Sequence, residues 1–151
     1  MPGTPRHTPH PQPWRIEFFQ RRAADDPQRS VPARDFLDSC STGVRADLLA
    51  VLKAVAEAPP PRFGGGGKWE AMHGVMKGFY EIRITGPSRR QYRLFCVLDR
   101  GDADAGTPCM VLIAGMSKPS GKTFSNRDYR RIRDLGRSSK VGRHAASCGS
   151  T

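Results

Sequence analysis

The chain has few of the features that identify metal-binding, secreted or membrane proteins. Its four cysteines form no C-x-x-C motif, and no histidine stands at zinc-finger spacing. The N-terminal segment MPGTPRHTPHPQP has no apolar core, so we do not expect it to act as a secretory signal. No apolar run approaches the ~20 residues that a membrane-spanning helix needs. We expect a soluble, cytoplasmic protein with no membrane partner, no disulfides and no metal or other cofactor.

The common catalytic sets are also missing. We find no Ser-His-Asp arrangement, no paired carboxylates and no cluster of metal ligands. His73 is interpreted as a turn or surface residue, and Cys96 and Cys109 as buried core residues. The segment SGKT at 120–123 is not a phosphate-binding P-loop, because that motif needs a glycine where the chain has Met116. Any catalysis is expected to depend on cationic side chains.

Positive charge is what the sequence has in excess. Its 25 Lys and Arg outnumber 14 Asp and Glu, which gives a formal net charge of +11 at pH 7. Residues 1–67 hold 9 basic and 7 acidic residues, whereas residues 68–151 hold 16 and 7. This asymmetry indicates a polyanionic partner such as nucleic acid, a nucleoprotein particle, a membrane surface or an acidic protein. A merely solubilising surface is the alternative, and we favour a binding face.

The N-terminal half is predicted to hold one strand and a helical hairpin. Residues 1–13 contain five prolines and are expected to form a disordered tail, and WRIEFF at 14–19 alternates like a strand. Apolar residues at helical spacing predict two consecutive helices at 31–40 and 41–58. The expected boundary residues are Ser30 as the cap of the first helix, Gly43 as its end, and Ser41 or Thr42 as the cap of the second.

The C-terminal half is predicted to hold strands and one short helix. The strands are WEAMHG, then FYEIRIT and QYRLFCVLD as a hairpin across Gly86–Arg90, then CMVLIAGMSK as a central strand. SNRDYRRIRDLGRS is predicted to be a short basic helix capped by Ser125 or Asn126. The chain is therefore predicted to be α+β, with helices on one face of a mostly antiparallel sheet. The domain is expected at 14–137, followed by a flexible basic tail at 138–151.

One arginine stands in the middle of each hairpin strand. Alternation across a loop of about five residues places Arg83 opposite Arg93, on the open face away from the helical hairpin. Like charges opposite each other cost roughly 0.2–1 kcal/mol, so an offsetting group is expected. Glu81 can supply it as a surface ion pair. The alternative is a bound anion, because guanidinium grips phosphate through two parallel hydrogen bonds.

The loop after the central strand adds to this pair. GMSKPSGKTF carries Lys118 and Lys122, followed by Phe124. The end of a central strand opens towards the same face as the hairpin arginines. The two arginines, the two lysines and the aromatic ring are therefore predicted to converge. Basic groups beside an aromatic ring are typical of surfaces that hold RNA phosphates and bases.

The chain resembles the RelE/HigB-type toxins of bacterial type II toxin–antitoxin systems, nearest to the phage-derived host-inhibition branch of the RelE/ParE superfamily. The resemblance covers about residues 14–137 and rests on the order of YEIRI, QYRLFCVLDRG, MVLIAGMSKPSGKT and a short helix. It implies a compact α+β toxin that enters the ribosomal A site, cleaves mRNA and so inhibits translation. It also implies neutralisation by a cognate antitoxin, often a helix-turn-helix DNA-binding protein.

The resemblance also implies which residues act. The catalytic candidates are Arg83, Arg93, Lys118 and Lys122. Arg93 and Lys118 would hold the scissile phosphate. The RNA-binding candidates are Phe124, Arg127, Tyr129 and Arg130. Phe124 stands where some relatives have a tyrosine, and it can stack on a base but cannot transfer a proton.

Two other functions are compatible with the pattern. A ParE-like toxin is not an enzyme and binds a protein such as DNA gyrase; that branch shares the fold and usually lacks basic residues in the centre of the sheet. An inactive basic RNA-binding module is the third possibility. Replacing Arg93 and Lys118 with alanine separates the nuclease from the ParE-like toxin, since only the nuclease should lose toxicity with its fold intact.

Overall fold

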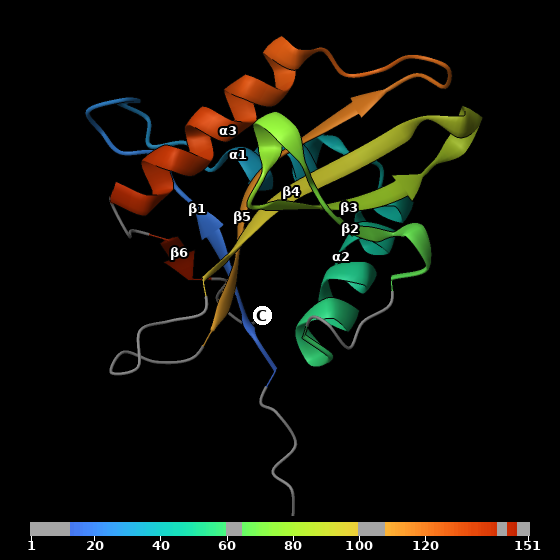
Figure 1. Ribbon diagram of the computed structural model, residues 1–151, viewed down its shortest axis with the longest axis horizontal. Helices are drawn as coiled ribbons and strands as arrows, with labels where there is room; N and C mark the ends of the chain where they lie inside the picture. The colour runs from blue at the N-terminus through green and yellow to red at the C-terminus, as the bar shows by residue number, and fades with distance from the viewer. Residues whose placement is uncertain (1–12, 60–64, 100–107, 142–144, 148–151) are drawn as a thin grey trace, which may run out of the picture.

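A mixed sheet and three α-helices make up the part of the chain that the computed structural model describes, residues 13–59, 65–99, 108–141 and 145–147. In chain order the elements are β1 (Arg15–Phe19), α1 (Pro32–Ser39), α2 (Thr42–Glu57), β2 (Trp69–Ala71), β3 (Phe79–Thr85), β4 (Gln91–Asp99), β5 (Cys109–Lys118), α3 (Asn126–Val141) and β6 (Ala145–Ser147). The predicted α+β class is confirmed (Figure 1). The tail predicted at 1–13 lies almost wholly outside the described residues.

The sheet has the strand order β2-β3-β4-β5-β1-β6. The described neighbours pair antiparallel except β1 and β5, which run parallel. The predicted hairpin of β3 and β4 and the interior position of β5 are both present. β5 is apolar almost throughout because helices cover both faces of the sheet beside it.

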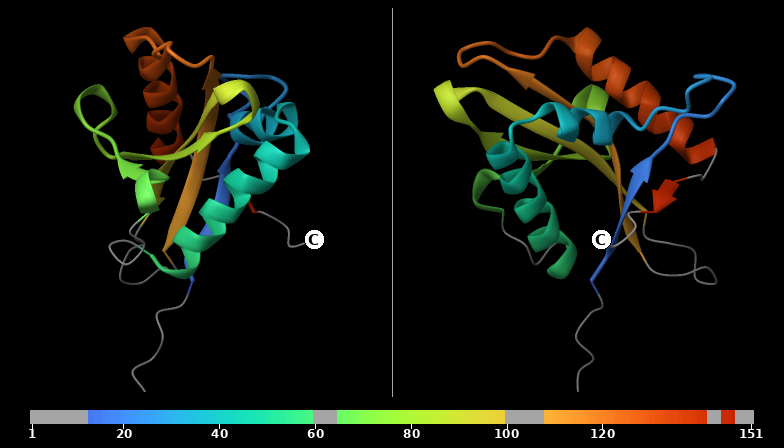
Figure 2. Two further views of the ribbon diagram at one scale, coloured as in Figure 1. Left: turned by 90° about the vertical axis from the view of Figure 1, so that its right-hand side faces the viewer. Right: turned by 180° about the vertical axis from the view of Figure 1, so that it is seen from behind.

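Helices cover both faces of this sheet, and the expectation that they share one face is wrong (Figure 2). α1 and α2 pack on one face, where strand alternation places Ile82 and Leu94. α3 packs on the other face, over Phe95 and Ile113. The phase of β3 and β4 explains this, because their outward positions also carry large apolar side chains that need a cover.

Local chemistry explains where α1 and α2 begin. The Ser41 hydroxyl accepts a hydrogen bond from the Val44 N–H, as predicted for the cap of α2. Ser30 does not cap α1, because its hydroxyl bonds to Asp26 instead and Val31 takes the cap position before the proline. Gly43 does not end α1 either. It lies in the first turn of α2, and the break falls at Cys40 and Ser41, which are extended.

α3 begins with a reciprocal cap and runs further than expected. The Ser125 hydroxyl accepts from the Asp128 N–H, and the Asp128 carboxylate accepts from the Ser125 N–H. The helix continues to Val141, past the predicted domain end at 137, and β6 lies inside the predicted tail, paired with β1. Gly136 lets α3 approach the sheet, since a Cβ there would lie 2.3 Å from the Phe79 ring.

Cys96 and Cys109 are buried, as the sequence predicted, and Cys40 is buried as well. Burial raises the pKa of the Cys109 thiol to about 11, which keeps it protonated at neutral pH. Cys148 lies outside the described residues. In the described part of the chain, no helix is both long and apolar enough to cross a membrane.

Candidate ribonuclease site

Arg83 and Arg93 lie opposite each other on β3 and β4, as predicted. Their surroundings differ, and the expectation of an open face is wrong for Arg93. The Arg93 side chain is only 7% exposed, whereas that of Arg83 is 37% exposed. α3 packs over the neighbouring part of this face, where its Tyr129 lies edge-on against Phe95, two residues along β4 from Arg93. The pair therefore presents one buried and one accessible guanidinium.

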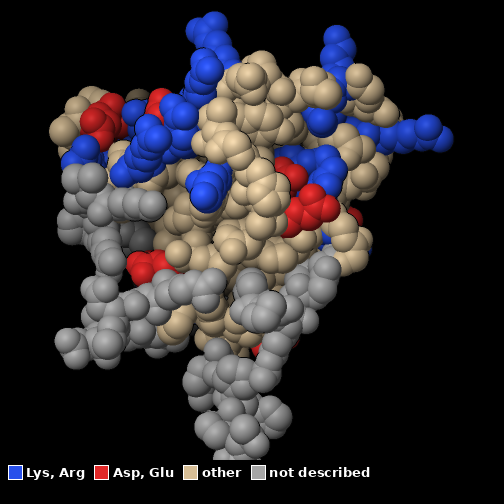
Figure 3. All heavy atoms as spheres, viewed as in Figure 1, with Lys and Arg blue, Asp and Glu red and all other residues tan. Residues whose placement is uncertain are grey.

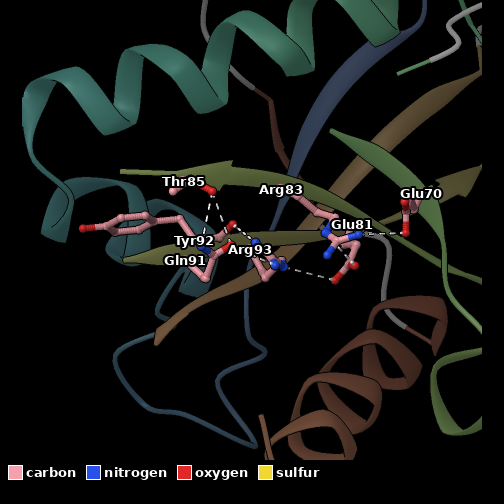
Figure 4. Close-up of polar contacts among 7 residues, drawn as sticks. All are labelled: Glu70, Glu81, Arg83, Thr85, Gln91, Tyr92 and Arg93. Atoms are coloured by element: carbon pink, nitrogen blue, oxygen red, sulfur yellow. Dashed lines mark hydrogen bonds and ion pairs between the residues drawn. The ribbon is translucent and has the colours of Figure 1, made fainter. Parts of the chain in front are cut away.

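Glu81 lies beside both arginines (Figure 4). Its carboxylate oxygens are 3.6 Å from Nε of Arg83 and 3.9 Å from Nε of Arg93, and its side chain is 13% exposed. Arg83 also pairs with Glu70 of β2, at 3.0 Å. The repulsion between the arginines is thus offset by carboxylates, as in the ion-pair alternative. Arg83 remains exposed enough to contact a further anion.

The Arg93 guanidinium is held by the strand on which it lies. Nη1 donates to the Tyr92 carbonyl at 3.0 Å, and Nη2 donates to Oε1 of Gln91 at 3.3 Å (Figure 4). Burial and the neighbouring Arg83 lower the pKa of Arg93, and Glu81 opposes them. These contacts fix the position of one positive charge under the surface.

Burial changes the proton affinity of two further groups. It raises the pKa of the Glu81 carboxyl above its ordinary value, although Arg93 and Arg83 pull that pKa down. It also raises the pKa of the Tyr129 phenol, with Glu81 adding to the effect and Arg93 opposing it. At neutral pH the phenol therefore keeps its proton. The mutual effects place Tyr129, Glu81 and the arginines in one electrostatic cluster.

A row of aromatic contacts joins the loop after β5 to this cluster. Nζ of Lys118 lies 4.8 Å from the centre of the Phe124 ring. Phe124 contacts Tyr129 edge-on at 5.9 Å between ring centres, and Tyr129 contacts Phe95 at 6.2 Å. Lys118 also lowers the pKa of Glu81. Lys118 and Phe124 therefore lie near the arginine cluster, as predicted.

The other candidate residues lie apart from the cluster. Lys122 is exposed on the loop, and no ion pair or ring contact in the described part of the chain joins it to the arginines. Arg127 and Arg130 are exposed on α3. Figure 3 shows basic side chains over the part of the surface where α3 and the β3–β4 hairpin lie. His73 is exposed and begins a 3₁₀ turn at Gly74–Met76, which agrees with its interpretation as a turn residue.

Glu81 and Tyr129 have a larger place in the site than the sequence indicated. The sequence pattern indicated Glu81 only as a counter-ion to the arginines and Tyr129 only as an RNA-binding residue. The period of two placed Glu81 and Arg83 on one face, and that face also carries Phe79 and Phe95. A carboxylate among large apolar side chains is the signal that could have identified a buried acid with a raised pKa.

Comparison of the chain with protein-family models, curated proteins and solved structures gave no match. Among the described residues, no group of three or more His, Cys, Asp or Glu side chains is placed to hold a metal ion. The described groups are a carboxylate, a phenol, two guanidiniums and an ammonium. Together they can transfer protons and stabilise negative charge.

Proposed function

We propose that the protein is the toxin of a toxin–antitoxin module, an endoribonuclease that cleaves mRNA on the ribosome and inhibits translation. The observation that carries the proposal is the position of Glu81, a carboxylate of raised pKa that lies within 4 Å of two arginines and interacts electrostatically with the protonated phenol of Tyr129. This combination supplies a base, an acid and positive charge at one place. The resemblance of the motif order to RelE/HigB-type toxins supports the same function.

The chemistry assigned to the cluster is transfer within the RNA strand. Glu81 accepts the proton of a ribose 2′-hydroxyl, whose oxygen attacks the adjacent phosphorus. The 5′-oxygen leaves and takes the phenolic proton of Tyr129, so the products are a 2′,3′-cyclic phosphate and a 5′-hydroxyl. The raised pKa makes Glu81 a stronger base than an exposed carboxylate.

In this mechanism one exposed and one buried positive charge stabilise the phosphate. Arg83 is the exposed guanidinium and contacts the phosphate oxygens, while Arg93 adds its charge from beneath the surface. Lys118 completes the set from the end of β5, and Phe124 beside it offers a face for a base to stack on. Arg127 and Arg130, exposed on α3, bind the RNA backbone outside the cluster.

The partners that follow from this function are mRNA within the ribosome and a cognate antitoxin in the bacterial cytoplasm. Codon-phased cleavage is expected because a ribosomal nuclease acts on mRNA held in register. The basic second half of the chain matches a nucleoprotein target.

The decisive experiment is induced expression of the full chain in a bacterial host, with growth and mRNA 5′ ends measured together. The wild type should arrest growth and produce new, codon-phased ends that carry a 5′-hydroxyl. Glu81→Gln should abolish both effects at equal soluble protein, because glutamine cannot accept the proton. Glu57→Gln, on the exposed side of α2, is the matched control and should act like the wild type.

Two results would contradict the nuclease. Growth arrest with intact mRNA would indicate a ParE-like toxin that binds a protein target such as DNA gyrase. Normal growth with soluble, folded protein would leave an inactive basic RNA-binding module. Arg93→Ala also separates the nuclease from a gyrase-type toxin, since it should remove the activity of the nuclease and leave the gyrase-type toxin largely unaffected.

A further inference from the structure

β5 extends well past the end of its neighbour β1. The parallel pairing of β1 with β5 ends at Phe18 and Leu112, whereas β5 continues to Lys118 and pairs with β4 again from Ala114 onward, after a β-bulge at Ile113. Among the described strands, residues 114–118 of β5 therefore pair with β4 only, and Ile113 pairs with neither neighbour. A strand edge of this kind presents main-chain donors and acceptors to any chain that can lie beside it.

The alternation of hydrogen bonds shows which groups face the open side. The Gly86 N–H donates to the Arg90 carbonyl at 2.8 Å, so every second residue counted along β4 from Arg90 forms its main-chain hydrogen bonds with β3. The β4 residues between them form theirs with β5, and the β5 residues opposite these are Ala114, Met116 and Lys118. The main-chain groups of Gly115 and Ser117 therefore point away from β4, to the line along which β1 would continue.

A groove follows this open edge between α1 and α3. Its first part has a volume of about 910 Å³ and is bordered by the loop after β1, the start of α1, α3 and Gly115. Its second part, about 540 Å³, continues past Gly115 and Ser117 between α1 and the start of α3. Both parts include Gly115 and Arg131, so they form one groove with the edge of β5 between its walls. Figure 2 shows α1 and α3 on opposite sides of β5.

Small residues keep the edge uncovered. An added Cβ at Gly115 would lie 2.0 Å from the Phe36 ring. Glycine at this position therefore lets α1 pack closely on β5. Ser117 is short and its hydroxyl is engaged by Nε of Arg90 at 3.1 Å. Neither side chain bends round to occupy the open side of the strand.

The charges of the groove are balanced, unlike those of the outer surface of α3. The charged residues that line it are Arg21, Arg22, Arg90, Arg131, Asp25, Asp35, Asp128 and Asp134. Equal numbers of each sign do not favour a polyanion such as RNA. A row of main-chain groups between partly apolar walls fits a polypeptide instead.

We propose that the edge of β5 at Gly115 and Ser117 binds an extended peptide segment of a partner protein, which joins the sheet as a strand in line with β1. Residues 113–118 offer a length of about 20 Å at roughly 3.3 Å per residue. The segment is therefore about four to six residues long, and its side chains alternate between the α1 wall and the α3 wall. Apolar side chains fit the α1 wall, where Phe36 and Tyr92 lie. This inference does not depend on the ribonuclease function.

The test uses the full chain and a displayed library of random peptides of about 12 residues as the probe. A selected peptide is synthesised, and amide hydrogen exchange is followed by NMR with and without it. In the free protein the Gly115 and Ser117 amides should exchange at least about tenfold faster than the Met116 amide. The peptide should slow both by about tenfold or more and leave the Ala71 amide, which faces outward at the opposite edge, unchanged.

Two proline variants sharpen the result. Ser117→Pro removes an outward N–H and no bond to β4, and it should weaken peptide binding about tenfold. Ala71→Pro makes the same change on β2 and should bind like the wild type. The proposal is overturned if Gly115 and Ser117 exchange as slowly as Met116 in the free protein, or if bound peptides leave their exchange unchanged. It is also overturned if Ser117→Pro binds as tightly as the wild type, if the library yields no peptide that binds, or if a uridine oligonucleotide protects these amides in place of a peptide.

Discussion

Glu81 and Arg93 are diagonal neighbours on the paired antiparallel strands β3 and β4, with 3.9 Å between Oε2 and Nε and little exposure of either side chain. Each group alone would be costly to bury, and together they offset only part of that cost, since burial still raises the pKa of Glu81 and lowers that of Arg93. Arg83 and Glu70 extend the pair to the surface. The cluster is therefore a structural unit as well as a candidate site, and substitutions in it should affect stability and activity to different extents.

The coupling of Glu81 with Arg93 should appear in a double-mutant cycle. Arg93→Ala leaves a nearly buried carboxylate without its guanidinium and should lower the free energy of unfolding by about 1–3 kcal/mol. Adding Glu81→Gln should recover part of that loss, because the unpaired charge is then removed. Urea unfolding of the four proteins measures the cycle. Strictly additive effects would show that the two side chains do not interact.

Glu81 should also make stability depend on pH. Because burial raises its pKa in the folded protein, protonation of Glu81 favours folding, and this contribution is fully present below the unfolded value of about 4.3. It is lost as pH rises through the raised folded pKa. As pH rises from the unfolded pKa through the folded pKa of Glu81, the unfolding free energy of the wild type should therefore fall relative to that of Glu81→Gln. A difference that is constant with pH would mean that Glu81 titrates normally.

Tyr129→Phe separates the phenolic proton from the packing of the ring. The ring contacts with Phe95 and Phe124 are kept, so the melting temperature should change little. Cleavage should fall by about 10²–10⁴-fold if the phenol is the general acid. The readout is cleavage of mRNA in a purified translation reaction with equal amounts of each protein. Full activity of this variant would remove Tyr129 from the mechanism and leave it as a packing residue.

Gly136→Val should displace α3 from the sheet. A Cβ at this position already meets the Phe79 ring at 2.3 Å, and the branched side chain adds to the clash. A loss of about 1–3 kcal/mol in stability is expected from such overpacking. Gly43→Ala is the control, since nothing lies within 4 Å of a Cβ there, and it should be neutral or slightly stabilising. Equal stability of both variants in thermal unfolding would contradict the close packing of α3.

Much of this fold is determined by interactions between residues close together in the sequence. The alternation of β3 and β4 and the length of the loop between them set the register, so Arg83 faces Arg93 as predicted. Ser41 caps α2, and Ser125 caps α3, because each hydroxyl reaches an amide one turn ahead. The burial of Cys96 and Cys109 likewise follows from the apolar runs that contain them.

Only the tertiary structure decided the properties on which the candidate site depends. The sequence placed Arg93 on an open face, but α3 packs there because the outward residues of β3 and β4 are apolar enough to need a cover. Burial on this face raises the pKa of Glu81, and α3 supplies Tyr129, whose phenol interacts electrostatically with Glu81 and Arg93. The open edge of β5 arises in the same way, since it depends on where β1 ends relative to a strand some 90 residues later. Burial and long-range pairing are properties of the packed elements together, and no local pattern encodes them.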